Sequence, residues 1–565
     1  MWVLTNKKLK EDFSKNHSFE GYSLYSNSVE LTKGSNSDKW LTNGYWTLKQ
    51  NDISDNQQDS LSLNILFLKY GNKFIEHVKG NFVIINLQSN QFSIYSDVFS
   101  IQKFFYWQSK DQFILSDNLN QITREIDLYP SAESIAIYSL CYHFCGGKTI
   151  FEDVSHNTPG QKIEFKNGRL NISSWVDHKS FLANKSEFVS IDQFATTLDN
   201  SIQDYLSKID PPKISLSLTS GVDSRLLFSI LLKKDIPLHT YTYGNKNSID
   251  CAFADRLASI FDIEHEIYDI EFSEELFKKY ARKSVELGQS LGSLHRAHRV
   301  AAHENEAKYA DTMILGTMGG EFVKGADHDD YIISDFVYEF SQNQEMAVLI
   351  KHLEKKGIRL DKIDIDYLLE FFRSQNWCKF PVLIDFYALI EIAASLHHSQ
   401  NNIQYSNYIK NILTPFMDLE YLELLFKSQY NFLNKKKLGK YFRRLENHKF
   451  SSDLQTYLSA ELSRIPYNSG FQASEYKVNK YYALIKSRIR KKRWNYKPNF
   501  PLDKWMYNYT RKELQSLNRN DHLLKETFNI PELIYSLENS KIVPKEAFWL
   551  KYTTPIQMKY LLELY

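Results

Sequence analysis

The chain contains only four cysteines in 565 residues, too few for a disulfide framework, which predicts a reducing compartment and hence a cytoplasmic protein. Lys+Arg (69) and Asp+Glu (68) leave a net charge of +1, which argues against nucleic acid or an anionic membrane as the main partner. No run of about 18 apolar residues is present, so no membrane span is expected, and the first ten residues lack the apolar stretch of a secretory signal.

Glycine (20) and proline (13) are also too scarce for a collagen-like or low-complexity chain. Hydrophobic residues, at 43%, and aromatic residues, at 15%, are in contrast plentiful, which excludes wholesale disorder and supports sizeable cores. The length predicts more than one structural unit.

Two patterns divide the chain near residue 186. The first part has short apolar and aromatic runs separated by polar breaks, at 82–87, 91–95 and 104–107, which predict antiparallel strands. After Pro211 and Pro212, strands alternate with helices, which indicates a parallel sheet with helices on both faces. Its strands are expected at 214–218, 238–243, 266–270 and 312–315. From about 335 onwards the sequence is mostly helical in pattern.

The segment Leu218-Thr-Ser-Gly-Val-Asp-Ser224 lies between the first expected strand and helix of that sheet. The small residues Thr219, Ser220 and Gly221 would let a phosphate approach the backbone amides, and the helix that begins near Ser224 adds its positive end. Asp223 could hold a Mg²⁺ ion that neutralises the phosphates. Because no Gly-Lys-Ser/Thr occurs here, this is not a Walker-type loop.

The same segment resembles the pyrophosphate loop, Ser-Gly-Gly-x-Asp-Ser, of ATP pyrophosphatases. Thr219 replaces the usual serine and Ser220 replaces the first glycine, and the Cβ of Ser220 is expected to narrow the phosphate cradle. An ordinary glycine-containing turn between a strand and a helix is the alternative interpretation of these seven residues alone.

Further segments, in order, resemble the asparagine synthetase family over residues of about 60 to 475. They are Tyr70–Phe82, Ser96–Tyr106, Thr149–Val154, Thr158–Gly160, Thr414–Asp418 and Lys440–Arg444. The resemblance implies an N-terminal antiparallel sandwich of the N-terminal nucleophile (Ntn) hydrolase type at 1–185. It further implies a doubly wound parallel-sheet ligase domain, like the adenine nucleotide alpha-hydrolases, at 186–475, followed by a helical extension at 476–565.

Two departures from the family qualify this resemblance. Family members that use glutamine carry a cysteine directly after the initiator Met, whereas position 2 here is Trp2, so the N-terminal domain is expected to lack glutaminase chemistry. In the segment Leu315–Gly325, Gly320 stands where the family has a metal-binding aspartate. Asp329 is one candidate for the missing carboxylate, either for Mg²⁺ or as a general base. A solvated acidic loop at 326–331 is the alternative.

The resemblance also implies which residues form the site. Catalytic roles fall to Lys440, Asp329 and Glu321, and the metal to Asp223. The nucleotide is expected to contact Leu218, Thr219, Ser220, Gly221, Asp223, Ser224, Tyr243 and Gly316. A fixed ammonium at Lys440 would stabilise charge that develops on phosphate oxygens and on the oxyanion. The alternative is that Lys440 only extends the basic face of 435–437.

Other conspicuous residues have simpler interpretations. Arg225 could bind an anion or lie on a helix surface, and the stretch 294–298, with two histidines and an arginine, could serve as a base or as a cap. Cys141 and Cys145 lack zinc-site spacing and are expected to be buried. The basic run 486–493 could contact RNA, an acidic polymer or lipid, although a solvated helix face is the default.

The leading functional hypothesis is ATP-dependent amide formation. Adenylation activates aspartate or another small or sugar carboxylate, pyrophosphate leaves, and ammonia or an amine displaces AMP, with Mg²⁺ as cofactor. Two alternatives stay open: an intramolecular cyclase of the β-lactam synthetase or lasso-peptide type, and a scaffold that has lost catalysis. No nucleic acid partner is expected. The oligomeric state, including a homodimer, is not assigned.

Overall fold

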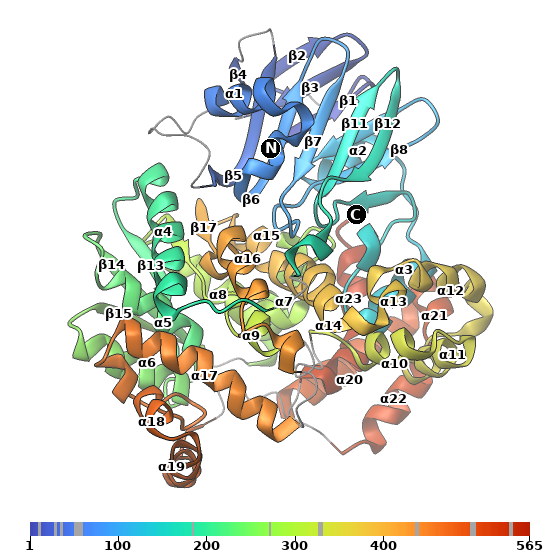
Figure 1. The fold of residues 1–565 in the computed structure, drawn as a ribbon. Helices are drawn as coiled ribbons and strands as arrows, with labels where there is room; N and C mark the ends of the chain where they lie inside the picture. The colour runs from blue at the N-terminus through green and yellow to red at the C-terminus, as the bar shows by residue number, and fades with distance from the viewer. Residues whose placement is uncertain are drawn as a thin grey trace.

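The computed structural model describes residues 1–565 except 10–12, 28–30, 34–37, 50–59, 183–185, 271–272, 326–331, 436–439, 498–503 and 542–545. Two antiparallel sheets and one parallel sheet organise the chain. Figure 1 shows the antiparallel sheets at the top, the parallel sheet at the lower left and the helices of residues 504–562 at the lower centre and right.

The N-terminal part is a two-sheet sandwich. One six-stranded sheet has the order β10-β8-β9-β1-β3-β2 and the other has the order β12-β11-β7-β6-β5-β4. Apolar side chains of both sheets, such as Trp2, Leu24, Ile85 and Phe165, meet in one buried cluster. The strands of the first sheet are β1 (Trp2–Thr5), β2 (Lys15–Phe19), β3 (Tyr22–Ser26), β8 (Phe105–Gln108), β9 (Phe113–Ser116) and β10 (Val154–His156). Those of the second are β4 (Thr32–Lys33), β5 (Lys39–Leu48), β6 (Val78–Leu87), β7 (Phe92–Ser96), β11 (Gln161–Lys166) and β12 (Arg169–Ser174).

The five-stranded parallel sheet has the order β15-β14-β13-β16-β17. Its strands are β13 (Ile214–Ser217), β14 (Leu238–Gly244), β15 (Glu264–Asp269), β16 (Thr312–Ile314) and β17 (Asn411–Leu413). The predicted parallel arrangement of the first four is confirmed, and β13 lies at the centre. The edge strand β17, which pairs with β16, was not expected, because it interrupts an otherwise helical stretch.

Helices follow each of the first four strands and enclose the sheet. They include α4 (Ile191–Ile209) before the sheet, then α5 (Val222–Leu231), α6 (Ile249–Ile260), α7 (Glu274–Leu287), α8 (Ala297–Glu306) and α9 (Glu321–Lys324). The predicted helical character beyond 335 is confirmed by α10 (Asp335–Asn343), α11 (Met346–Lys355), α12 (Ile365–Arg373), a π-helix (Leu389–His398), α15 (Ser399–Tyr405), α16 (Leu419–Lys427) and α17 (Lys440–Leu458). The last helices are α18 (Ala473–Val478), α19 (Lys480–Arg493), α20 (Lys504–Asn520), α21 (His522–Thr527), α22 (Ile530–Asn539) and α23 (Glu546–Leu562).

The sandwich and the parallel sheet meet at a polar contact. Lys79 of β6, almost fully buried, contacts Asp204 of α4 at 3.1 Å, Asp418 at 3.7 Å and Glu420 of α16. Asn81 Nδ2 donates a hydrogen bond to Thr414 Oγ1 at 2.8 Å. The segment Thr414–Asp418 therefore joins the two parts. The domain boundaries proposed near 185 and 475 stay predictions.

None of the helices within the described residues combines the length and apolar character needed to cross a bilayer.

Candidate nucleotide site

The turn after β13 occupies the carboxyl end of the central strand, where parallel sheets place their ligand sites. Leu218 extends the sheet, because its N–H donates to Tyr241 O at 2.9 Å and its carbonyl accepts from Thr242 Oγ1 at 2.6 Å. Gly221 then caps α5, and having no side chain it makes no capping hydrogen bond to the first amides of the helix. These first-turn amides of α5 therefore face the end of the sheet with the positive helix terminus behind them.

Three amides of the turn already donate hydrogen bonds to side chains of the protein. The N–H of Thr219 donates to Ser224 Oγ at 3.1 Å, that of Ser220 to Asp250 Oδ1 at 3.2 Å, and that of Gly221 to Thr219 Oγ1 at 3.1 Å. The hydroxyl of Ser220 also donates to Asp250. An anion that bound these amides would have to displace the side-chain oxygens.

A cavity of about 220 Å³ opens directly against this turn. Seven of the predicted site residues line it: Thr219, Gly221, Asp223, Ser224, Tyr243, Gly316 and Glu321. Leu218 and Ser220 do not line it, and both are buried. The expected narrowing by the Ser220 side chain is therefore wrong, because that side chain bonds to Asp250 at the start of α6.

Asp223, in the first turn of α5, faces the glycine-rich segment 316–320. Its Oδ2 accepts the N–H of Gly320 at 3.0 Å, and a Cβ added to Gly319 would lie 2.9 Å from its Cγ. Burial raises the pKa of Asp223, whereas Lys324 and the Gly320 amide act in the opposite direction. Glycine at 316, 319 and 320 therefore lets the segment pass against the Asp223 carboxylate.

Asp223 is the residue predicted to bind a Mg²⁺ ion. Mg²⁺ usually takes one or two carboxylates together with phosphate oxygens and water. A Cβ at Gly320, where the family resemblance places an aspartate, would lie only 2.6 Å from Lys324 Nζ, so an ammonium occupies that space. No group of three His, Cys, Asp or Glu within the described residues could hold a metal ion. Asp223 as a ligand of Mg²⁺ therefore stays a prediction, and no step below depends on the ion.

The opposite wall of the cavity is basic and aromatic, and sequence reasoning missed it. It is formed by Arg299, His303, His398, Asn401 and Tyr405. Arg299 Nη1 donates to Asn401 Oδ1 at 3.0 Å. Burial and the nearby guanidinium groups of Arg296 and Arg299 hold the pKa of His398 well below its usual range, so its imidazole is neutral. Neither ring nitrogen of His398 has a hydrogen-bond partner within the described part of the chain.

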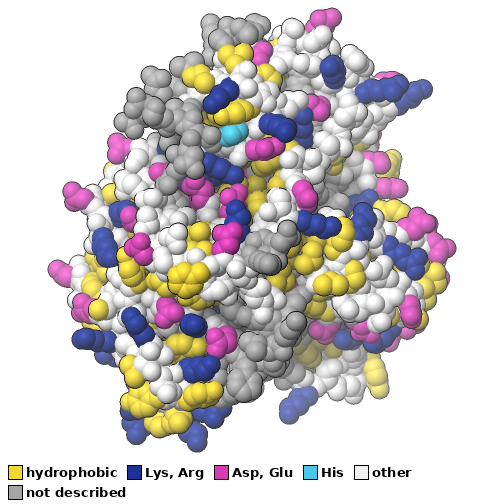
Figure 2. Space-filling view, in the orientation of Figure 1, with side chains coloured by type: hydrophobic (Ala, Val, Ile, Leu, Met, Phe, Trp, Pro, Cys, Tyr) yellow, Lys and Arg dark blue, Asp and Glu magenta, His cyan; other side chains and the backbone are white. Residues whose placement is uncertain are grey.

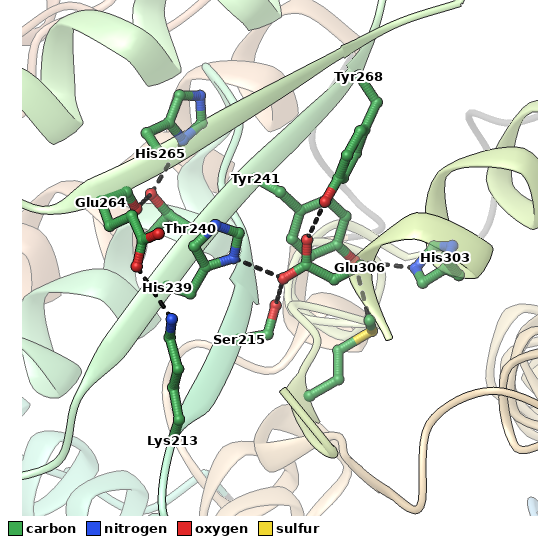
Figure 3. A network of polar contacts seen from close by, with 11 residues as sticks. Lys213, Ser215, His239, Thr240, Tyr241, Glu264, His265, Tyr268, His303 and Glu306 are labelled. Atoms are coloured by element: carbon green, nitrogen blue, oxygen red, sulfur yellow. Dashed lines mark hydrogen bonds and ion pairs between the residues drawn. The ribbon is translucent and has the colours of Figure 1, made fainter. Parts of the chain in front are cut away.

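A polar network fixes this wall to the sheet (Figure 3). Glu306, fully buried at the end of α8, accepts from Tyr268 at 2.8 Å, pairs with His239 Nδ1 at 2.7 Å and accepts from Ser215. One turn earlier, His303 Nε2 lies 2.9 Å from the hydroxyl of Tyr241. Because these partners belong to β13, β14 and β15, the network sets the position of α8 and of Arg299 near its start.

The stretch 294–298 is mostly buried and does not line the cavity, so neither the role of a base there nor that of an exposed cap fits it. His295 Nε2 lies 2.8 Å from Thr553 Oγ1, and Arg296 contacts His397 of the π-helix. Burial holds the pKa of His298 well below its usual range. The residue that does reach the cavity is Arg299, one position after the conspicuous stretch.

Arg225 has neither of the roles considered for it. It is fully buried, and its two terminal nitrogens donate to the carbonyls of Ile465 at 3.0 Å and Pro466 at 2.8 Å. The following Asn468 N–H donates to Ser220 O at 3.2 Å. Arg225 thus attaches the 465–468 segment to the turn instead of binding a ligand.

Two predicted catalytic residues cannot be placed. Asp329 lies outside the described residues, as does the side chain of Lys440, whose backbone begins α17. Their roles stay predictions. Cys141 and Cys145 are buried, as expected, and burial is the main cause that raises the pKa of the Cys141 thiol.

A second cavity, of about 500 Å³, lies between the sandwich and α15. Met1, Lys103 and Asp117 line its N-terminal side, whereas Trp2 is packed in the sandwich core. Asn402 and Ile403 of α15 line this cavity, and Asn401 and Tyr405 of the same helix line the first one. One helix therefore contributes to both walls.

Searches for similar proteins gave no match to a known family profile and none to a curated protein. Among solved structures, the chain is similar to glutamine phosphoribosylpyrophosphate amidotransferase from B. subtilis, at 10% identity and a TM-score of 0.19, covering 59% of this chain and 78% of that one. It is also similar to NMN synthetase from Francisella tularensis, at 14% identity and a TM-score of 0.18, covering 39% and 95%.

A third structure, titled as the allosteric regulatory enzyme of purine biosynthesis, matches at 8% identity and a TM-score of 0.20, over 46% of this chain and 56% of that one. Similarity of this extent assigns neither a family nor an activity to the chain.

Proposed function

We propose that this protein is an ATP-dependent, amide-forming ligase of the asparagine synthetase type. One observation carries the proposal: the turn at 218–224 stands at the carboxyl end of the central parallel strand and lines a cavity that faces Arg299. A guanidinium opposite a helix N-terminus is suited to a polyphosphate, because both offer N–H donors and positive charge. The resemblance of the turn to a pyrophosphate loop supports the same assignment.

The proposed reaction has two steps. A carboxylate oxygen of the acyl substrate attacks the α-phosphorus of ATP, the bond to the β-phosphate oxygen breaks, and pyrophosphate leaves. Ammonia or an amine then attacks the acyl carbon, AMP departs with its oxygen, and the nitrogen loses a proton. In this scheme Arg299 and the amides of the first turn of α5 neutralise the pyrophosphate, and the surrounding walls exclude water from the acyl adenylate.

Within this scheme His398 is suited to position the amine of the second step. Its imidazole is neutral, and neither ring nitrogen has a hydrogen-bond partner within the described part of the chain. The unprotonated ring nitrogen can accept a hydrogen bond from the attacking amine and orient it toward the acyl carbon. The acyl substrate, whether aspartate or another small or sugar carboxylate, is the part of the proposal that the screen below identifies.

A pyrophosphate-release screen over a panel of carboxylates, with and without ammonia, tests the proposal. We expect release with at least one carboxylate, and we expect Asp223→Ala to abolish it. The matched control is Asp235→Ala, an exposed position beyond the other end of α5, which should keep full activity. Repeated turnover without ammonia, beyond one pyrophosphate per protein, would point to the intramolecular cyclase, and undiminished activity of Asp223→Ala would refute the site.

The second candidate is a scaffold without catalysis, and specific contacts favour it. Three amides of the turn are engaged by side chains, and Lys324 fills the space where the family resemblance places a metal ligand. Binding of ATP to the purified protein without turnover of any carboxylate would support the scaffold. Absence of ATP binding would overturn both the ligase and the intramolecular cyclase, because each of them needs the nucleotide.

A further inference from the structure

An apolar stripe runs along the exposed side of α19. Ile485, at 58% exposed, lies on it together with Tyr481, Tyr482 and Ile489. Ile485 follows Tyr481 by four residues and Tyr482 by three, and Ile489 follows Ile485 by four, so these four side chains share one face of the helix. Single exposed apolar side chains are common, but a continuous stripe of this length marks a surface that binds something.

Basic side chains border the stripe on both sides. The sequence of α19, KYYALIKSRIRKKR, contains seven basic residues and no acidic one, although the whole chain carries a net charge of only +1. Lys486 and Arg493 fall on one flank of the stripe, Arg488 falls on the other, and Lys492 lies at its C-terminal end. Figure 2 shows hydrophobic and basic side chains gathered over α18 and α19 at the lower left of the molecule.

The helix is fixed to the protein through its other face. Ala483 and Ser487 are buried, and a Cβ added to Gly470 would lie 2.5 Å from Ser487 O, so helix and loop are in close contact. Arg490 donates to Glu475 Oε2 at 2.7 Å and to Gly470 O at 3.0 Å. Because these contacts hold α19 in place, the stripe faces outward, at the end of the molecule away from the sandwich (Figure 1).

We infer that α19 binds the protein to an anionic lipid surface. A helix that presents aliphatic and tyrosine side chains between rows of Lys and Arg is suited to lie in the interface, with its apolar side chains among acyl chains and its cations at the headgroups. Nucleic acid offers the same charge but no apolar layer for Ile485 and Ile489. The inference does not depend on the proposed ligase activity.

Flotation of the full-length protein with vesicles tests the inference. We expect binding to vesicles of phosphatidylcholine and phosphatidylglycerol, little binding to phosphatidylcholine alone, and release at high salt. Ile485→Glu and the double variant Lys491→Glu/Lys492→Glu should each lower the association constant of the protein for the mixed vesicles by about tenfold or more. Ile260→Glu, at a similarly exposed apolar position on α6, is the control and should bind as the wild type does.

Three outcomes would overturn the inference. One is equal binding to both kinds of vesicle, and another is unchanged binding by Ile485→Glu. The third is the absence of vesicle binding, in which case two further measurements identify what the stripe contacts instead. Binding of single-stranded RNA that is lost with the lysine variant would show a nucleic acid surface, and a dimer in sedimentation that Ile485→Glu disrupts would show a second copy.

Discussion

Ser220 shows how a single side chain changes role between a family pattern and this protein. In the pyrophosphate-loop pattern its position is a glycine, and a side chain there is expected to narrow the space for a phosphate. Here its hydroxyl and its amide both bond to Asp250, and the side chain lies outside the cavity wall. The serine therefore fixes the turn to the start of α6.

This contact predicts the effect of substitution. Ser220→Ala should lower the free energy of unfolding by about 2 kcal/mol, because a hydrogen bond to a carboxylate is lost in a buried place. Urea unfolding measures this effect, with Ser207→Ala, at an exposed position on α4, as a control expected within about 0.5 kcal/mol. Ser220→Gly should not raise the affinity for ATP in equilibrium dialysis. A clear gain in affinity would show that the Cβ does restrict the cradle.

Only some of the residues that line the candidate site could be predicted from the sequence. Thr219, Gly221 and Asp223 could be found because they follow a buried strand in one short motif. Arg299 and His398 lie about 100 residues apart in sequence, and only the tertiary contact of α8 with α15, which follows the π-helix, brings them together. Such a constellation depends on tertiary structure, so local pattern could not indicate it.

At the scale of elements, the π-helix Leu389–His398 is the least expected feature. Strands such as β6 and β14 were predictable because continuous apolar runs specify them, whereas a π-helix is selected by its surroundings and often occurs at functional sites. This one carries Ser395, which accepts from the buried Lys103 at 3.1 Å, and it ends at His398 in the cavity. It also carries Glu391, whose Oε1 accepts from Asn376 Nδ2 at 2.6 Å.

Glu391 makes the stability of this element depend on pH. Burial raises the pKa of Glu391 from 4.5 to about 7, so ionisation is harder in the folded than in the unfolded chain. Its stabilising contribution is therefore complete below pH 4.5 and is lost as the pH rises to 7. The loss amounts to about 3 kcal/mol. Urea unfolding at pH 5 and pH 8 should show this decline in the wild type and a smaller one in Glu391→Gln.

Glu370→Gln, at an exposed position on α12, is the control and should keep the wild-type dependence. If the glutamine variant at 391 loses as much stability between the two pH values as the wild type does, another group titrates.

At the scale of the whole molecule, one buried cation holds the sandwich against the parallel sheet. Lys79 faces three carboxylates, those of Asp204, Asp418 and Glu420, and Asp418 ends the segment Thr414–Asp418 described above. Asp418 also caps α16 and accepts from Tyr205 at 2.9 Å. The conspicuous Thr414–Asp418 motif is thus occupied by contacts between the two parts, and the sequence alone could not separate that structural role from a catalytic one.

Removal of this cation should therefore affect the entire fold. Lys79→Met leaves neighbouring carboxylates without their partner, which should lower the free energy of unfolding by about 3–5 kcal/mol. Calorimetry or urea unfolding measures the loss. Lys49→Met is the matched control, because Lys49 pairs with Glu423 at 3.1 Å in a more exposed place, and the expected loss there is below about 1 kcal/mol. Equal losses in both variants would contradict the anchoring role of Lys79.

Helix α15 separates the two cavities by the width of one helix, with Asn401 on one side and Asn402 on the other. Mutational effects in these two spaces should therefore not be independent, since a substitution that tilts α15 reshapes both at once and double variants across it depart from additivity. Selection for a new ligand specificity in either cavity would change α15, which also lines the other cavity. The residues that line the two cavities are therefore expected to evolve together.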